Sequence, residues 1–284
     1  MLSTRNRDLK IILGQLYALW LREFKVFLRE RSRLVASTFN PLLWLFVIGS
    51  GLGSTNLQIG ADYQKFIFPG IICMSVIFTS VFFGSYIIWD RKFDFLKSVM
   101  VAPSSRTTVF VGKTLGGMTT SLFQVAIILV IGVPLGINYD ALSLLQIISI
   151  ALILSFGLTS LGLTFGSYIE SLEGFQLIVS FVVFPLFFLS GALFPIDNLP
   201  AWLSFITLID PATYSVDAIR NSILHLGTYS FELDLLLLLL FTLLITLIGI
   251  FSFKRMRPCN FRNCDRPFFY IHIFFNAKGL CKSV

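Results

Sequence analysis

Six long stretches of the sequence are free of Asp, Glu, Lys and Arg, and they set the pattern of the whole chain. They cover residues 34–53, 66–89, 114–136, 143–168, 174–195 and 235–253. Each is long enough to cross the roughly 30 Å hydrocarbon core of a bilayer as a helix, which takes about 20 residues. The connections between them are too short to build a soluble shell around six apolar helices. The pattern therefore predicts an all-α integral membrane protein with six transmembrane helices.

Composition strengthens this prediction. Of the 284 residues, 56% are hydrophobic and 13% are charged, whereas roughly 25% of the residues of an ordinary soluble domain are charged. Disordered, fibrous and disulfide-stapled proteins are excluded, because they are more polar, more periodic or richer in cysteine. We therefore expect a multi-pass protein of the plasma (cytoplasmic) membrane that is in contact with membrane lipid.

Basic residues alternate between the two sides of the predicted membrane. Eight Lys and Arg precede the first run, five lie between the second and third runs, and seven follow Phe253. The opposite side holds only Lys65 and Arg220. Because Lys and Arg are enriched in cytoplasmic connections, this distribution predicts that both termini are cytoplasmic. The connection between the fourth and fifth runs is then cytoplasmic too, although its charges are only Glu170 and Glu173.

The segment before the first run has the pattern of an amphipathic helix. In residues 9–31, apolar side chains recur at helical spacing, and Arg22, Lys25 and Arg29 lie on another face. This pattern is typical of a helix at the membrane surface, and a generic basic anchor is the alternative. We divide the chain into an N-terminal amphipathic segment (1–33), a six-span domain (34–257) and a cytoplasmic tail of unknown role (258–284).

The connection after the second run also shows helical spacing, up to Pro103. Its apolar positions are Phe93, Leu96 and Met100, and its charged positions on the opposite side are Asp90, Asp94 and Lys97. The spacing predicts a short helix that either offers a small surface to a soluble partner or is simply a solvated loop helix.

Residues 196–230 connect the fifth and sixth runs and are too hydrophobic for a simple loop. Asp210 and Pro211 have the residue types of a helix N-cap and first helical position. We expect one or two short outer helices that dip into the membrane surface, with Asp217 and Arg220 on the solvated face. Packing of these helices against the spans is equally compatible with the pattern.

No pattern in the chain supports catalysis. The V-G-K-T sequence that ends at Thr114 lacks the first glycine of a phosphate-binding loop, because Thr107 stands there. We therefore interpret Lys113 as a positively charged flank of the third span. The two His residues are far apart and match no metal motif. We expect no enzyme activity, bound cofactor, metal site or nucleic-acid partner. The lack of charge inside the runs also argues against an ion-driven carrier.

Several segments together resemble the type-2 ABC transporter permease family. They are FPGI (68–71), WDRKFDFLKSVMVAPSSR (89–106), GKTLGG (112–117), FPLFFLSGALFPIDNLPAWL (184–203) and IDPATYSVDAIR (209–220). The match extends over about residues 10–257, and it is most similar to daunorubicin-resistance-like exporter permeases and to polysaccharide exporter membrane subunits. It implies a permease subunit that moves a drug-like, lipid-like or polysaccharide substrate out of the cytoplasm.

The resemblance also implies partners. Two such subunits pair, as a homodimer here, and each rests on a separate ABC-type ATPase that binds and hydrolyses ATP. The residues implied in coupling to the ATPase are Asp90, Arg91, Lys92, Phe93, Asp94, Leu96, Lys97, Met100, Glu170 and Glu173. Those that we expect along the substrate path are Asn40, Phe78, Phe82, Phe184 and Phe187. A stand-alone carrier or channel that is not coupled to an ATPase is the alternative.

Overall fold

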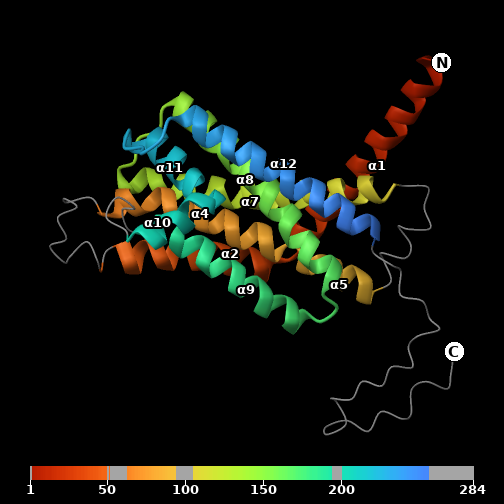
Figure 1. Cartoon of the computed structure of the whole chain (residues 1–284), viewed down its shortest axis with the longest axis horizontal. Coiled ribbons are helices and arrows are strands. Elements are labelled where there is room, and N and C mark those ends of the chain that lie inside the picture. Colours follow the sequence, from red (N-terminus) through yellow and green to blue (C-terminus); the bar gives the residue numbers. More distant parts are fainter. Residues whose placement is uncertain (1, 50, 52–62, 94–104, 194–199, 256–284) are drawn as a thin grey trace, which may run out of the picture.

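The structure is a computed structural model, and it describes residues 2–49, 51, 63–93, 105–193 and 200–255. The described part of the chain is all-helical, as the sequence predicts (Figure 1). Its elements are α1 (Leu2–Arg29), α2 (Arg31–Leu43), η1 (Trp44–Ile48), α4 (Tyr63–Phe82), α5 (Ser85–Lys92), α7 (Arg106–Gly132), η2 (Val133–Leu135), α8 (Ala141–Tyr168), α9 (Leu172–Leu189), α10 (Ala201–Ile209), α11 (Pro211–Leu224) and α12 (Phe231–Arg255).

Five helical segments among the described residues are long and apolar enough to cross a membrane. They are Tyr63–Lys92, Arg106–Leu135, Ala141–Tyr168, Leu172–Leu189 and Phe231–Arg255. The first predicted span, 34–53, corresponds to a shorter apolar helical stretch, Leu34–Ile48. Two predicted segments lie outside the described residues: the tail 258–284, and the part of the 90–113 connection that holds Asp94, Leu96, Lys97 and Met100.

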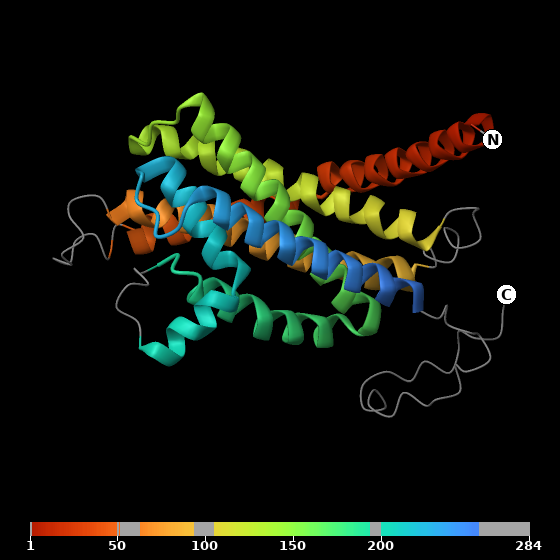
Figure 2. The same ribbon diagram turned by 45° about the horizontal axis from the view of Figure 1, so that its top comes forward.

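Helix α4 is the centre of the bundle. It contacts α2, α7, α8, α9 and α11. In the most apolar stretch of the segment Tyr63–Lys92, 83% of the residues are buried, against 22% in the corresponding stretches of α9 and of α12. Most of its side chains are buried, and those of Phe68, Ile72 and Ile77 are fully buried. The outer helices surround it in both views (Figures 1 and 2). The second predicted span therefore contains the central helix, against which most of the other helices pack.

Glycines bring α8 into backbone contact with the junction between α4 and α5. A Cβ atom on Gly84 would lie 2.0 Å from the carbonyl oxygen of Gly162, and one on Gly162 would lie 2.2 Å from that of Val81. A Cβ atom on Gly166 would lie 2.4 Å from the carbonyl oxygen of Gly84. Small residues allow such approaches between helices in membranes. The Gly162 and Gly166 pair therefore fixes how α8 crosses the start of α5.

Hydroxyl groups join α8 to α12. The Thr242 hydroxyl donates to the Ile153 carbonyl oxygen over 3.0 Å, and the Ser167 and Ser252 hydroxyls lie 3.0 Å apart. The two hydroxyls of α12 share the buried face of this leucine-rich helix with Leu238, whereas Leu240 and Leu243 are exposed on the outside of the bundle. The hydroxyls therefore help to select the face of α12 that turns inward.

The segment after α9 forms two short helices, α10 and α11, as expected. Asp210 caps α11, and its side-chain oxygen Oδ1 accepts a hydrogen bond from the Ala212 N–H over 2.8 Å. One expectation is wrong: Asp217 and Arg220 are not on a solvated face but are 2% and 6% exposed. They are buried because α11 packs against α4, α8 and α12.

Both of these buried charges have hydrogen-bond partners, as buried polar groups require. The Asp217 carboxylate accepts from the backbone N–H groups of Thr228 and Tyr229 over 2.9–3.0 Å. The Arg220 guanidinium donates to the Gly191 carbonyl oxygen over 2.9 Å. The two residues therefore join α11 to the α9–α10 connection and to the α11–α12 connection.

Replacement of Gly162 by alanine tests the close contact between α8 and the α4–α5 junction. The added methyl group meets the Val81 backbone, so we expect a loss of about 1–3 kcal/mol of stability, measured by thermal unfolding of the detergent-purified protein. Gly14→Ala is the matched control, because a Cβ atom there meets nothing within 4 Å. Equal unfolding temperatures for Gly162→Ala and the wild type would contradict the contact.

The cap of α11 predicts a pH dependence. Burial raises the pKa of Asp210 from 3.8 to about 8, against the lowering effect of the hydrogen bond from Ala212. A raised carboxyl pKa contributes stability that is complete below the unfolded value and is lost as pH rises through about 8. Asp210→Asn caps equally well without titrating, so its unfolding temperature should vary less between about pH 4 and pH 8. Parallel profiles for the two proteins would contradict this.

Candidate functional site

A cleft of about 280 Å³ opens between α2 and α4. Nine residues line it: Ala36, Ser37, Asn40, Pro41, Met74, Ser75, Phe78, Thr79 and Phe82. Three of the residues expected along the substrate path therefore line one cavity, Asn40 from α2 and Phe78 and Phe82 from α4. Of the other six lining residues, three are apolar and three carry short hydroxyl side chains.

The two other residues of the expected path, from α9, lie next to this cleft. The ring of Phe184 is 5.7 Å from that of Phe78, edge to face, and the ring of Phe187 is 6.4 Å from it. Phe78 also stacks on Phe82 at 6.2 Å. The structure thus brings all five residues together around Phe78, although their contact with a substrate stays a prediction.

The polar wall of the cleft is organised by Gln124 of α7, which sequence reasoning did not select. Its side-chain amide donates to the Ser37 hydroxyl and accepts from the Thr79 hydroxyl over 2.9 Å. Gln124 is only 1% exposed, and a buried side-chain amide needs hydrogen-bond partners within the protein. Its partners here come from neighbouring helices. Gln124 therefore ties α7 to both helices that line the cleft.

Pro41 changes the helix that forms the cleft's other wall. Proline has no N–H to donate to the carbonyl four residues earlier, and the chain passes into the π-helical turn Trp44–Ile48 three residues later. Single π-helical turns are common next to functional sites. In this turn, the Trp44 ring lies 5.7 Å from that of Phe187. The Asn40–Pro41 pair was the signal in the sequence for this irregularity.

The residues expected to couple to an ATPase fall into two groups. Lys92 and Phe93 are exposed at the end of α5, with the Phe93 ring stacked 5.7 Å from that of Trp89 and the Lys92 ammonium 5.6 Å from the same Trp89 ring. Glu170 and Glu173 are exposed at the turn between α8 and α9. These four are accessible to a partner.

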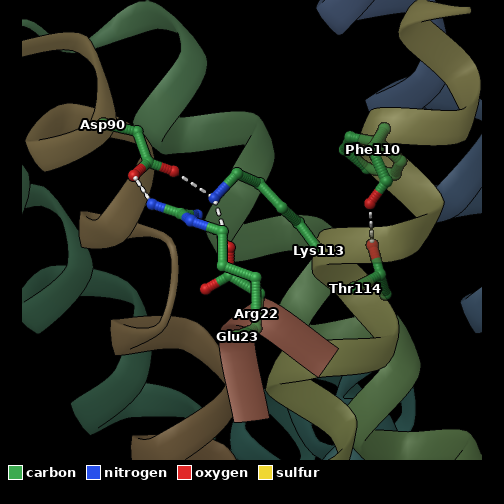
Figure 3. Close-up of polar contacts among 6 residues, drawn as sticks. All are labelled: Arg22, Glu23, Asp90, Phe110, Lys113 and Thr114. Atoms are coloured by element: carbon green, nitrogen blue, oxygen red, sulfur yellow. Dashed lines mark hydrogen bonds and ion pairs between the residues drawn. The ribbon is translucent and has the colours of Figure 1, made fainter. Parts of the chain in front are cut away.

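Asp90 differs from the expectation, because it is buried and not on a solvated face. Figure 3 shows its carboxylate directed at Arg22 of α1 and Lys113 of α7. It accepts from the Arg22 guanidinium over 2.8 Å and from the Lys113 ammonium. Glu23 completes the group, 3.0 Å from the Lys113 ammonium and 2.7 Å from the Arg22 guanidinium. We call these four side chains the ion cluster.

Lys113, interpreted from the sequence as a positively charged flank of the third span, is buried inside the bundle. Its side chain is 0% exposed, against 2% for Glu23 and 31% for Arg22. A buried ammonium is stable only when it is paired and hydrogen-bonded, and here two carboxylates supply that pairing. The cluster contains two positive and two negative groups, so its formal charge is zero.

Glycines of the GKTLGG segment allow the ion cluster to form. A Cβ atom on Gly112 would meet Leu19 at 2.9 Å, and one on Gly116 would meet Glu23 at 2.6 Å. These glycines are one helical turn apart, as are Leu19 and Glu23, so α1 and α7 lie close together along one seam. The carboxylate of Glu23 can therefore reach Lys113 from the neighbouring helix.

Arg91, next to Asp90, points to a different helix. Its guanidinium donates to the carbonyl oxygens of Gly166, Ser167 and Ile169 over 3.0, 3.1 and 3.4 Å. The first two belong to the last turn of α8, whose carbonyls have no partner within the helix. Arg91 is therefore a cap on α8 supplied by α5.

The described part of the chain contains no group of three His, Cys, Asp or Glu side chains that could hold a metal ion.

The candidate site consists of the aromatic cleft between α2 and α4 and of the ion cluster at one end of the bundle. Sequence reasoning missed Glu23 and Lys113 as partners. The available signal was that Lys113 is the only charge between Arg106 and Asp140.

Replacement of Lys113 by methionine tests the ion cluster. It leaves the two buried carboxylates to share the single, partly exposed guanidinium of Arg22, and breaking a buried ion pair costs about 3–5 kcal/mol in comparable cases. We expect a large fall in the unfolding temperature of the detergent-purified protein. Lys25→Met is the control, because Lys25 is exposed on α1, two residues after Glu23, and is not one of the four residues of the ion cluster. Similar stability of the two variants would show that the cluster does not hold these helices.

Known proteins place the chain among transport permeases. The protein family described as "ABC-2 type transporter" matches residues 14–224 of this chain. A putative transport permease, ycf38, of Cyanophora paradoxa is 27% identical over 258 residues, which cover 85% of this chain and 88% of that protein. The ycf38 protein of Porphyra purpurea is 31% identical over 219 residues, 74% of each chain.

A third relative is the inner membrane transport permease YadH of Escherichia coli K12. It is 26% identical over 223 residues, which cover 75% of this chain and 84% of YadH. The family match extends from α1 to the end of α11 and so includes the aromatic cleft, the ion cluster and Arg91. With its several apolar helices, this multi-pass membrane protein belongs to the ABC-2 type transporter family.

Proposed function

We propose that the chain is the permease subunit of an ABC exporter and takes its energy from a separate ATPase subunit. The observation that carries this proposal is the family match over residues 14–224, because ABC-2 permeases normally work with an ATPase subunit. In this proposal the chain has six spans, both termini are cytoplasmic, and two copies form a homodimer. ATP is bound and hydrolysed by the partner and not by this chain.

The substrate path in this proposal is the aromatic cleft. Phe78 is at its centre, with Phe82 on the same helix and Phe184 and Phe187 contributed by α9. Aromatic faces bind apolar groups and also stack on sugar rings, so a drug-like, lipid-like or polysaccharide substrate suits this lining. Asn40 adds one amide to the wall, which can orient a polar group of the substrate.

The ATPase contact in this proposal is the exposed set at the predicted cytoplasmic end. Phe93 is 74% exposed, and an exposed aromatic beside a lysine is the kind of side chain that anchors a protein interface. Glu170 and Glu173 form a smaller, acidic part of the same contact. Asp90 and Arg91 support these residues from within, because their side chains bind neighbouring helices.

Purification of the tagged chain in mild detergent from its own cells tests the proposal. We expect an ATP-hydrolysing subunit to co-purify with it. The variant Lys92→Glu with Phe93→Ala should reduce that recovery several-fold, because interface aromatics contribute about 1–2 kcal/mol or more. Arg255→Gln, at the exposed end of α12, is the control and should retain it.

Two results would contradict the proposal. Reproducible isolation of the chain without any ATPase favours a stand-alone carrier or channel. Full recovery of the ATPase with the double variant, at wild-type expression, means that the end of α5 is not the contact.

A further inference from the structure

Helix α5 is held on two sides at its last turn. Asp90 binds Lys113 and Arg22 of the ion cluster, and Arg91, the next residue, binds the carbonyl oxygens at the end of α8. Consecutive residues of a helix are about 100° apart around its axis, so they contact different neighbours. The start of α5 is also fixed, because Gly84 is in backbone contact with Gly162 and Gly166.

The hydrogen bonds of Arg91 join two segments that are far apart in the sequence. The partners lie 75, 76 and 78 residues after it. A guanidinium near the C-terminus of a helix is also favoured by the negative end of the helix dipole. When the end of α5 is displaced, these hydrogen bonds should therefore move the last turn of α8 with it.

The turn that follows α8 leads directly to the cleft. The Ser171 side chain caps α9 by accepting from the Gly174 N–H over 3.1 Å. Two turns further on, α9 buries Val179 and Val183, and then presents Phe184 and Phe187 to Phe78. Arg91 is thus at the start of a continuous packed route from the end of α5 to the aromatic cleft.

We infer that Arg91 is a positioning residue that makes the end of α5 and the 166–173 turn move as one unit. The exposed Lys92 and Phe93 on one side and Glu170 and Glu173 on the other then respond together to the ATPase. This inference rests on the proposed function for the nature of the partner, but the rigid link itself is a property of the single chain.

Hydrogen–deuterium exchange of the purified chain without an ATPase tests the link. Arg91→Gln removes the charge-assisted hydrogen bonds to the end of α8, so peptides covering residues 166–173 should exchange at least about tenfold faster. Peptides covering residues 141–160 should be unchanged. Arg91→Lys, which retains one charged donor, should fall between the wild type and Arg91→Gln. Arg255→Gln is the control and should behave as the wild type. Unchanged exchange of residues 166–173 in Arg91→Gln would overturn the inference.

The same experiment on the complex with its ATPase tests the shared response. In the wild type, ATP with vanadate should alter exchange of residues 85–93 and 166–173 together. In Arg91→Gln the change should persist at 85–93 and be lost at 166–173, whereas Arg91→Lys should restore part of it. A wild-type response of both segments that survives Arg91→Gln would overturn the inference. Absence of any associated ATPase would instead count against the proposed function, and the single-chain result would still decide the link.

Discussion

Two acidic and two basic side chains from α1, α5 and α7 meet at one end of the bundle, where three of them are buried and Arg22 is partly exposed. Each would be costly to bury alone, and the four are stable because Lys113 and Arg22 share the carboxylates of Glu23 and Asp90. The close seam between α1 and α7 is required for this arrangement, since the glycines of α7 let Glu23 approach. The position of the N-terminal helix, and with it the orientation of the last turn of α5, therefore depends on this neutral cluster.

The rest of the molecule is arranged so that this end is connected to the cleft. Helix α5 is continuous with the central helix α4 except for the turn at Gly84, and α4 carries Phe78 and Phe82. On its other side α5 is bound to α8 through Arg91, and α8 leads into α9 with Phe184 and Phe187. Two helical routes thus run from one short helix to the same aromatic cleft. In the proposed function, these two routes connect the proposed ATPase contact to the proposed substrate path.

Much of this architecture could be predicted from the pattern of uncharged runs, because a bilayer demands long apolar helices whatever their packing. The cap at Asp210 and Pro211 could also be predicted, because an N-cap depends only on the residues at the start of its own helix. The burial of individual charges could not be predicted. A lysine that flanks a span in water and a lysine that is buried have the same appearance in the sequence, and Lys113 is buried only because Glu23 and Asp90 lie close to it. Asp217 and Arg220 were misplaced for the same reason, because their burial depends on three other helices.

The interaction between Glu23 and Lys113 can be measured most directly by a double-mutant cycle on unfolding of the purified chain. Glu23→Gln and Lys113→Met are made separately and together. If the two side chains share one buried neutral cluster, the combined loss of stability is smaller than the sum of the single losses by about 1 kcal/mol or more. Strictly additive losses would mean that the two residues act independently, and would contradict the account of how α1, α5 and α7 are held together.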